Sequence, residues 1–140
     1  INMKKFILAL LLLNTAVFSS GYEEAWEARK NGDYKKAMEL YQKACDDNDA
    51  KSCNKLGLLY KTGKNTKPNN KKADELYNKA NELFKKDCDN GDAFACFFLG
   101  GAYKNGQEGL EQNKTIAKDY YGRACDLDHQ LSCEYYQDLN

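Results

Sequence analysis

Six cysteines are the residues of this 140-residue chain with the most chemistry open to them, because paired cysteines form disulfides, bind zinc or carry out thiol redox reactions. They form three pairs with seven intervening residues each: Cys45 and Cys53, Cys88 and Cys96, and Cys125 and Cys133. Cysteine ligands of zinc usually lie about two to four residues apart, and His129 is the only histidine in the sequence. No Cys-x-x-Cys redox motif occurs. The pattern therefore predicts disulfides, with no metal and no cofactor.

The regular spacing also narrows the choice of pairing, although sequence alone does not strictly decide among the many combinations of six cysteines. Pairing within each gap uses all six cysteines in the same way. Pairing the second cysteine of one pair with the first of the next leaves Cys45 and Cys133 without a partner. We therefore predict one local bridge per pair, and loop entropy gives each bridge about 2–3 kcal/mol of stabilisation.

Two short motifs match those of serine β-lactamases, in which a serine hydroxyl is the nucleophile. They are Ser52-x-x-Lys55 and Lys61-Thr62-Gly63. Ser52 and Lys55 are three residues apart and could meet on a helix. In those enzymes, however, the second motif lies on a strand far along the chain, whereas both motifs here fall in one short predicted helix and its exit turn. We interpret the match as chance and lean against an enzyme, with Ser52 and Lys55 as the weaker catalytic alternative.

Helices must position these residues, because the chain has one proline, few β-branched residues and abundant Ala, Leu, Lys and Glu. Apolar residues recur at three- and four-residue steps, the period of an amphipathic helix. The predicted helices cover residues 22–30, 34–44, 50–61, 70–88, 93–104, 114–126 and 130–139. Within each cysteine pair, Asn48, Gly91 or Asp128 can take the left-handed conformation that ends a helix. The sequence thus predicts an all-α chain of helical hairpins with a bridge across each turn.

The helical unit is repeated along the chain. Superimposing the cysteine pairs aligns three columns of apolar residues: Ala37, Ala80 and Ala117; Leu40, Leu83 and Tyr120; Tyr41, Phe84 and Tyr121. Between Ala73 and Cys88 the middle unit carries seven additional residues, about two helical turns. We expect this extra length to preserve the buried face, to protrude near Pro68, and to reflect neutral drift rather than a binding element.

The first residues have the pattern of a secretion signal, with Met3, Lys4 and Lys5 followed by an apolar stretch over residues 6–17 and small residues at 19–21. We predict a signal peptide over 1–20, cleaved near 19–21, and a mature domain over 21–140. The apolar stretch is shorter than the about 20 residues that span a bilayer, so no membrane insertion is expected after cleavage. The mature domain is expected in the periplasm or outside the cell, where disulfides persist.

The charge balance argues against two classes of partner. Lysine plus arginine and aspartate plus glutamate each number 21, so removal of Lys4 and Lys5 leaves about two net negative charges. Neither nucleic acid nor an anionic membrane is an obvious electrostatic partner of such a domain.

Two segments carry a family resemblance. They are Cys53-x-x-Leu56-Gly57-x-x-Tyr60-x-x-Gly63 and Cys96-x-x-Leu99-Gly100-x-x-Tyr103-x-x-Gly106, each followed by a helix that ends in cysteine. These segments resemble Sel1-like repeats, and with the cysteine spacing the chain is similar to the secreted Helicobacter cysteine-rich protein family. The opening unit, from Gly32 to Ala44, is closer to a tetratricopeptide repeat. The resemblance implies a right-handed α/α superhelical solenoid with a disulfide in each repeat, and relatives described as penicillin-binding proteins or weak β-lactamases.

A groove follows from the same resemblance. The inward positions of the related tetratricopeptide helix fall on ten residues: Tyr22, Trp26, Arg29, Lys51, Asn54, Leu58, Lys61, Phe94, Phe97 and Lys104. Aromatic and arginine side chains dominate binding hot spots, and lysines could receive carboxylates of an extended peptide. The phenylalanines could instead pack against the next repeat.

The predicted function is that of an exported, disulfide-stabilised scaffold that binds a protein or extended peptide, expected to act as a monomer. The alternative is a penicillin-binding protein or weak β-lactamase.

Asn113 is a candidate modification site. Asn113-Lys114-Thr115 is an N-glycosylation sequon, and Glu111 is the acidic residue, two positions before the asparagine, that bacterial N-glycosylation requires.

Overall fold

The computed structural model describes residues 20–140, and the signal peptide predicted over 1–20 lies almost wholly outside these residues. The described part forms seven helices and no strand: α2 (Gly21–Lys30), α3 (Tyr34–Asp46), α4 (Ala50–Thr62), α5 (Asn70–Asp89), α6 (Ala93–Asn105), α7 (Lys114–Asp126) and α8 (Gln130–Asp138). These bounds follow the predicted ones within about two residues. No helix among them is both long and apolar enough to cross a bilayer.

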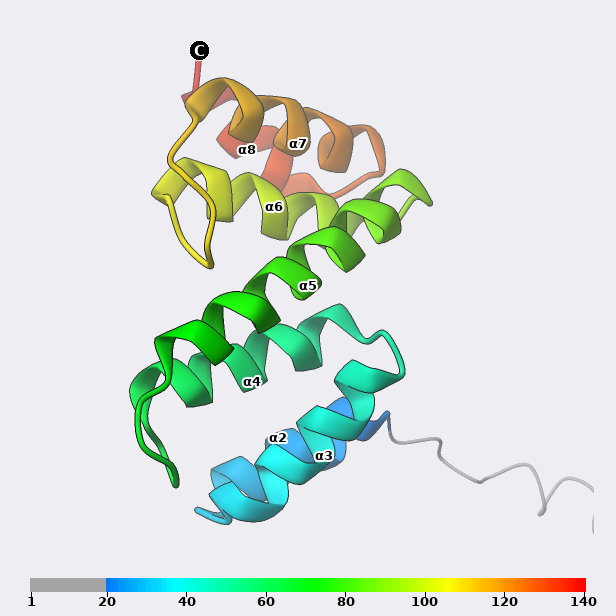
Figure 1. Ribbon diagram of the computed structural model, residues 1–140. Helices are drawn as coiled ribbons and strands as arrows, with labels where there is room; N and C mark the ends of the chain where they lie inside the picture. The colour runs from blue at the N-terminus through cyan, green and yellow to red at the C-terminus, as the bar shows by residue number, and fades with distance from the viewer. Residues whose placement is uncertain (1–19) are drawn as a thin grey trace, which may run out of the picture.

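Each helix packs on the next one along the chain, so the helices stack as a solenoid. Figure 1 shows α2 and α3 at one end, α4 and α5 in the middle, and α6, α7 and α8 at the other end. The predicted all-α solenoid of helical hairpins is confirmed. Because each hairpin buries its apolar face only against its neighbours, stability arises from the stacking.

The turns predicted inside the cysteine pairs are also confirmed. Asn48 and Asp128 have φ values of 66° and 65°, in the left-handed region, and Gly91 has a φ of 92°. One residue later, the Asp49 and Asp92 carboxylates accept hydrogen bonds from amides in the first turns of α4 and α6. The chain therefore reverses within three residues and brings the two cysteines of each pair together.

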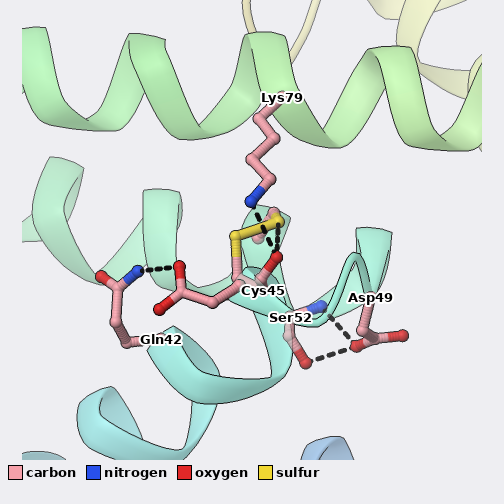
Figure 2. The surroundings of a disulfide bond; sticks show 7 residues. Gln42, Cys45, Asp49, Ser52 and Lys79 are labelled. Carbon is pink, nitrogen blue, oxygen red and sulfur yellow. Dashed lines mark hydrogen bonds between the residues drawn. A yellow bond between two sulfur atoms is a disulfide. The ribbon is translucent and has the colours of Figure 1, made fainter.

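Three disulfides join the pairs as predicted: Cys45–Cys53, Cys88–Cys96 and Cys125–Cys133. They link the end of α3 to the start of α4, α5 to α6, and α7 to α8. The Lys79 ammonium on α5 donates a hydrogen bond of 2.9 Å to the Cys45 carbonyl oxygen at the end of α3 (Figure 2). A cation there compensates the negative end of the α3 dipole and ties a third helix to this turn.

Glycines allow two helix pairs to approach closely. A Cβ atom on Gly57 of α4 would lie 2.9 Å from the Tyr77 ring of α5, and one on Gly100 of α6 would lie 2.7 Å from the Tyr121 ring of α7. Both tyrosines are buried. The absence of a side chain at these two positions therefore sets the register of each pair.

The two additional turns of α5 preserve the buried face but do not protrude near Pro68, which corrects our expectation. Ala73 and Tyr77, in the first half of α5, are buried against α4 next to Gly57. In α7, Cys125 is the fourth residue after Tyr121, whereas in α5, Cys88 is the eleventh residue after Tyr77. The extra length thus lies after Tyr77 and places Cys88 about 10 Å farther along the helix. Figure 1 shows α5 running from the layer of α4 to the layer of α6.

Candidate functional site

Four of the ten predicted groove residues line one pocket between α2, α4 and α6. Tyr22 comes from α2, Lys51 and Asn54 from α4, and Phe94 from α6. Three further lining residues were not among the predicted groove residues: Lys55, Phe84 and Phe98. The pocket has a volume of about 170 Å³. We refer to these seven residues as the α2–α4–α6 pocket.

Cations lie over aromatic rings along this face. The Lys51 ammonium is 4.4 Å from the centroid of the Phe94 ring, which connects α4 to α6. Lys55 of α4 and Arg29 of α2 lie over Trp26, at 5.7 and 5.2 Å from its ring. Such contacts hold positive charges on an aromatic surface without neutralising them.

The remaining predicted groove residues lie farther along the same helices. Lys61 lies 5.9 Å from the centroid of the Tyr77 ring, and Lys104 lies 4.8 Å from that of Tyr135 on α8. Leu58 is half-buried and is not among the residues that line the pocket.

Phe97 and Phe94 have different environments. The Phe97 ring stacks on His129 at 4.6 Å and lies about 6 Å from Tyr121 and Tyr135, in a cluster formed by α6, α7 and α8. Phe94 is 41% exposed. Phe97 therefore packs against the following helices, which was the alternative to a place in the groove. Phe94 is exposed and available to a ligand.

A second hollow of about 170 Å³ adjoins the pocket, because both are lined by Phe98. Glu108, in the connection between α6 and α7, lines this second hollow. Its backbone has a φ of 50°, and its carbonyl oxygen accepts a 2.8 Å hydrogen bond from the buried Asn81 amide. Burial raises the pKa of the Glu108 carboxyl, and the charges of Lys61 and Lys55 partly oppose this increase.

Charge is distributed unevenly over the described helices. Helix α4 carries Lys51, Lys55 and Lys61, and α6 carries Lys104, but neither helix contains an aspartate or glutamate. Helix α2, by contrast, carries Glu23, Glu24 and Glu27 as well as Arg29 and Lys30. Burial, followed by the charges of Glu23 and Asp49, raises the pKa of Tyr22. Helices α4 and α6 thus present a cationic and aromatic surface, although lysine plus arginine equal aspartate plus glutamate over the whole chain.

Ser52 is buried at the start of α4. Its side chain is 0% exposed, and its hydroxyl and its amide both donate hydrogen bonds to the Asp49 carboxylate (Figure 2). The equivalent residue after the next turn is Ala95, which is also 0% exposed and whose amide is capped by Asp92 in the same way. The Lys55 ammonium lies over Trp26. The side chains of Ser52 and Lys55 therefore have separate partners, and Ser52 offers no surface to a substrate.

His129 and the acidic residues do not form a metal site within residues 20–140, where no cluster of three metal-binding side chains occurs. The His129 Nδ1 atom lies 2.8 Å from the buried Ser132 hydroxyl, at the start of α8. The histidine thus takes the place that Asp49 has at the start of α4.

Asn113 is exposed and caps α7, with its side-chain oxygen accepting a 3.0 Å hydrogen bond from the Ile116 amide. The sequon therefore lies at an accessible helix start. Glycosylation of Asn113 stays a prediction, which a glycan mass on the peptide that contains this residue would test.

The chain resembles several known proteins. "Putative beta-lactamase HcpE" of Helicobacter pylori (strain ATCC 700392 / 26695) is 40% identical over 43 residues, which are 31% of this chain and 12% of that protein. The match thus spans only about an eighth of that relative. A solved Sel1 repeat protein from Oxalobacter formigenes superimposes with a TM-score of 0.56 at 26% identity, over 84% of this chain and 45% of that one. For Helicobacter pylori cysteine rich protein B the TM-score is 0.49 at 22% identity, over 84% of this chain and 98% of that one.

The family model described as "Sel1 repeat" matches three segments of the chain, residues 22–49, 50–91 and 93–129. Each segment contains one helix pair of the solenoid: α2 with α3, α4 with α5, and α6 with α7. Each disulfide therefore joins the second helix of one repeat to the first helix that follows it. Because the three segments cover most of the chain, it belongs to the Sel1 repeat family.

Proposed function

We propose that this protein is an exported scaffold that binds an extended segment of another protein along the face formed by α2, α4 and α6. The observation that carries the proposal is the convergence of side chains from the first helix of all three repeats on one pocket. Solvent-exposed Phe94 and half-buried Trp26 and Tyr22 give this surface the aromatic groups that dominate protein interfaces.

Export is supported by the three disulfides, which persist in oxidising compartments and are rare elsewhere. The apolar stretch over residues 6–17 supports it independently. We propose the domain division at residue 20 on the same grounds.

Charge reversal on the inward helices is expected to weaken ligand binding. Peptides would be selected from a random displayed library with the oxidised domain and their affinities measured by fluorescence anisotropy. Lys61→Glu or Arg29→Glu should lower affinity by about fivefold or more, because each replaces a cation of the binding face with an anion. Lys35→Glu on α3, where the lysine is exposed, is the matched control and should bind normally.

Hydrogen exchange would locate the bound peptide. We expect amide protection on α2, α4 and α6 when a selected peptide is added. Protection confined to α3, α5 and α7, or no selectable peptide, would contradict a binding role for the inward face.

A β-lactam-directed function is the alternative, supported by the name of the relative HcpE and by the Ser52-x-x-Lys55 motif. The buried, capped hydroxyl of Ser52 argues against it. We expect the oxidised protein to show neither turnover of a chromogenic β-lactam nor a covalent β-lactam adduct by intact-mass spectrometry. An adduct that disappears in folded Ser52→Ala and Lys55→Ala variants would reverse this preference.

A further inference from the structure

We infer that the α2–α4–α6 pocket takes one large apolar side chain of a peptide whose neighbouring residues are acidic. This inference rests on the proposed function and specifies the ligand of the same face. It follows from the size and aromatic lining of the pocket, from the charges around it, and from the longer helix α5, which contributes Phe84 to the lining.

The wall of the pocket is aromatic. Tyr22, Phe84, Phe94 and Phe98 line it, and the rings of Phe84 and Phe98 stack with their centroids 4.1 Å apart. A volume of about 170 Å³ is similar to that of a protein cavity of roughly 150 Å³ that binds benzene. The pocket is therefore large enough for the ring of a phenylalanine or the branched end of a leucine.

The polar residues of the pocket favour an anion beside that side chain. Lys51, Lys55 and Asn54 are its three polar residues apart from the Tyr22 hydroxyl. The ion pairs within residues 20–140 are Lys30–Glu27, Lys85–Glu82 and Arg123–Asp89, so neither pocket lysine is paired. A carboxylate next to the bound apolar residue would thus meet two cations without displacing an existing salt bridge.

Three acidic residues act on the residues of the pocket: Glu23 and Asp49 lie near Tyr22, and Glu108 lies near Lys55. Asp49 is already engaged, because its carboxylate accepts hydrogen bonds from the Ser52 amide and hydroxyl. Glu108 interacts with Lys55 and Lys61 through space, without an ion pair within 4 Å. Replacement of Glu108 by glutamine should therefore strengthen the binding of an acidic peptide.

The additional two turns of α5 contribute to this pocket. Phe84 lies between Tyr77, which packs on Gly57 of α4, and Cys88, which forms the disulfide to α6. The extra residues of α5 fall in this segment. In α7, which lacks this segment, the tyrosine that packs on the preceding glycine is only four residues from its cysteine. The longer α5 thus places a phenylalanine between α4 and α6, which gives the extension a binding role instead of neutral drift.

Three fluorescein-labelled peptides test the inference: one with a phenylalanine flanked by glutamates, an analogue with serine in place of phenylalanine, and an analogue with lysines in place of glutamates. We expect the first to bind the oxidised domain at least about tenfold more tightly than either analogue by fluorescence anisotropy. Its affinity should also fall with added salt, because the lysines are exposed or half-buried.

Variants connect this preference to the pocket. Phe94→Ala and Lys51→Glu should each lower affinity for the first peptide about tenfold, and Glu108→Gln should raise it. Ile116→Ala, at a side chain of similar exposure on α7, and Lys35→Glu are the controls and should leave it unchanged. Circular dichroism would confirm that every variant is folded.

Equal binding of the glutamate and lysine peptides, or native affinity in both pocket variants, would overturn the inference. If library-selected peptides still protect α2, α4 and α6, such a result leaves the proposed function standing. If no peptide protects these helices, the proposed function and the inference both fail.

Discussion

Reduction of the three disulfides is expected to leave the domain largely unfolded at room temperature. Each bridge closes a loop with a sequence separation of 8 residues, for which the loop-entropy model gives about 2.5 kcal/mol of stabilisation. Together they contribute about 7.5 kcal/mol, comparable with the whole stability of a typical domain, about 5–15 kcal/mol. Alanine is the commonest residue of the buried core, and its small side chain buries little apolar area. Apolar burial therefore contributes little free energy to replace that of the bridges.

Urea titration followed by circular dichroism, with and without a phosphine reductant, measures this effect. The oxidised domain should unfold cooperatively, whereas the reduced domain should have lost most of its helical signal before urea is added. A reduced protein that keeps its helical signal and its unfolding midpoint would show that stacking alone is sufficient.

The individual bridges should differ. Cys88 and Cys96 are buried in the middle of the stack, whereas Cys125 and Cys133 are partly exposed and hold only the last helix. Because repeats interact mainly with their neighbours, replacing Cys88 and Cys96 by serine should disconnect two halves of the stack. The same change at Cys125 and Cys133 should release α8 alone and serves as the matched comparison.

Local sequence signals predicted the helices, turns and bridges, because each depends on residues close together in the chain. Asn48, Gly91 and Asp128 identified turns through their tolerance of positive φ. The equal gaps between cysteines identified the bridges, since pairing within each gap uses all six cysteines in the same way.

The pocket was predicted only in part, because it depends on how successive repeats are offset. Alignment by cysteines grouped Phe84 with Tyr41 and Tyr121, yet contact with the preceding glycine places Tyr77 in the position of Tyr121. The two registers differ by the seven additional residues. The sequence alone does not show which of these two alignments of α5 with α7 is structurally correct. Phe84 and Phe98, whose rings stack, were therefore not predicted as pocket residues.

The phenylalanines of α6 illustrate the same difficulty. Phe94, Phe97 and Phe98 all lie within two turns, and residue type does not distinguish them. Their roles depend on α8, which places His129 and Tyr135 against Phe97 but leaves Phe94 open. Contacts between distant segments therefore decide which aromatic group is available for binding.

Gly100→Ala is expected to lower the free energy of unfolding by about 2 kcal/mol, because a methyl group would lie 2.7 Å from two ring carbons of Tyr121. The Tyr121 residue is 2% exposed and its ring contacts those of Phe97 and Tyr135, so a shift of the ring would disturb these contacts. The higher helix propensity of alanine offsets only part of the cost.

Gly101→Ala is the matched control, in the same helix and one residue away. A Cβ atom there meets only the Tyr121 hydroxyl, at 3.6 Å, which is an ordinary contact. This change should therefore raise stability by about 0.5–1 kcal/mol through helix propensity alone. Urea midpoints of the two variants should move in opposite directions. A shift of the same sign in both would mean that Gly100 is not required for the approach of α6 and α7, and that the spacing of the repeat is set elsewhere.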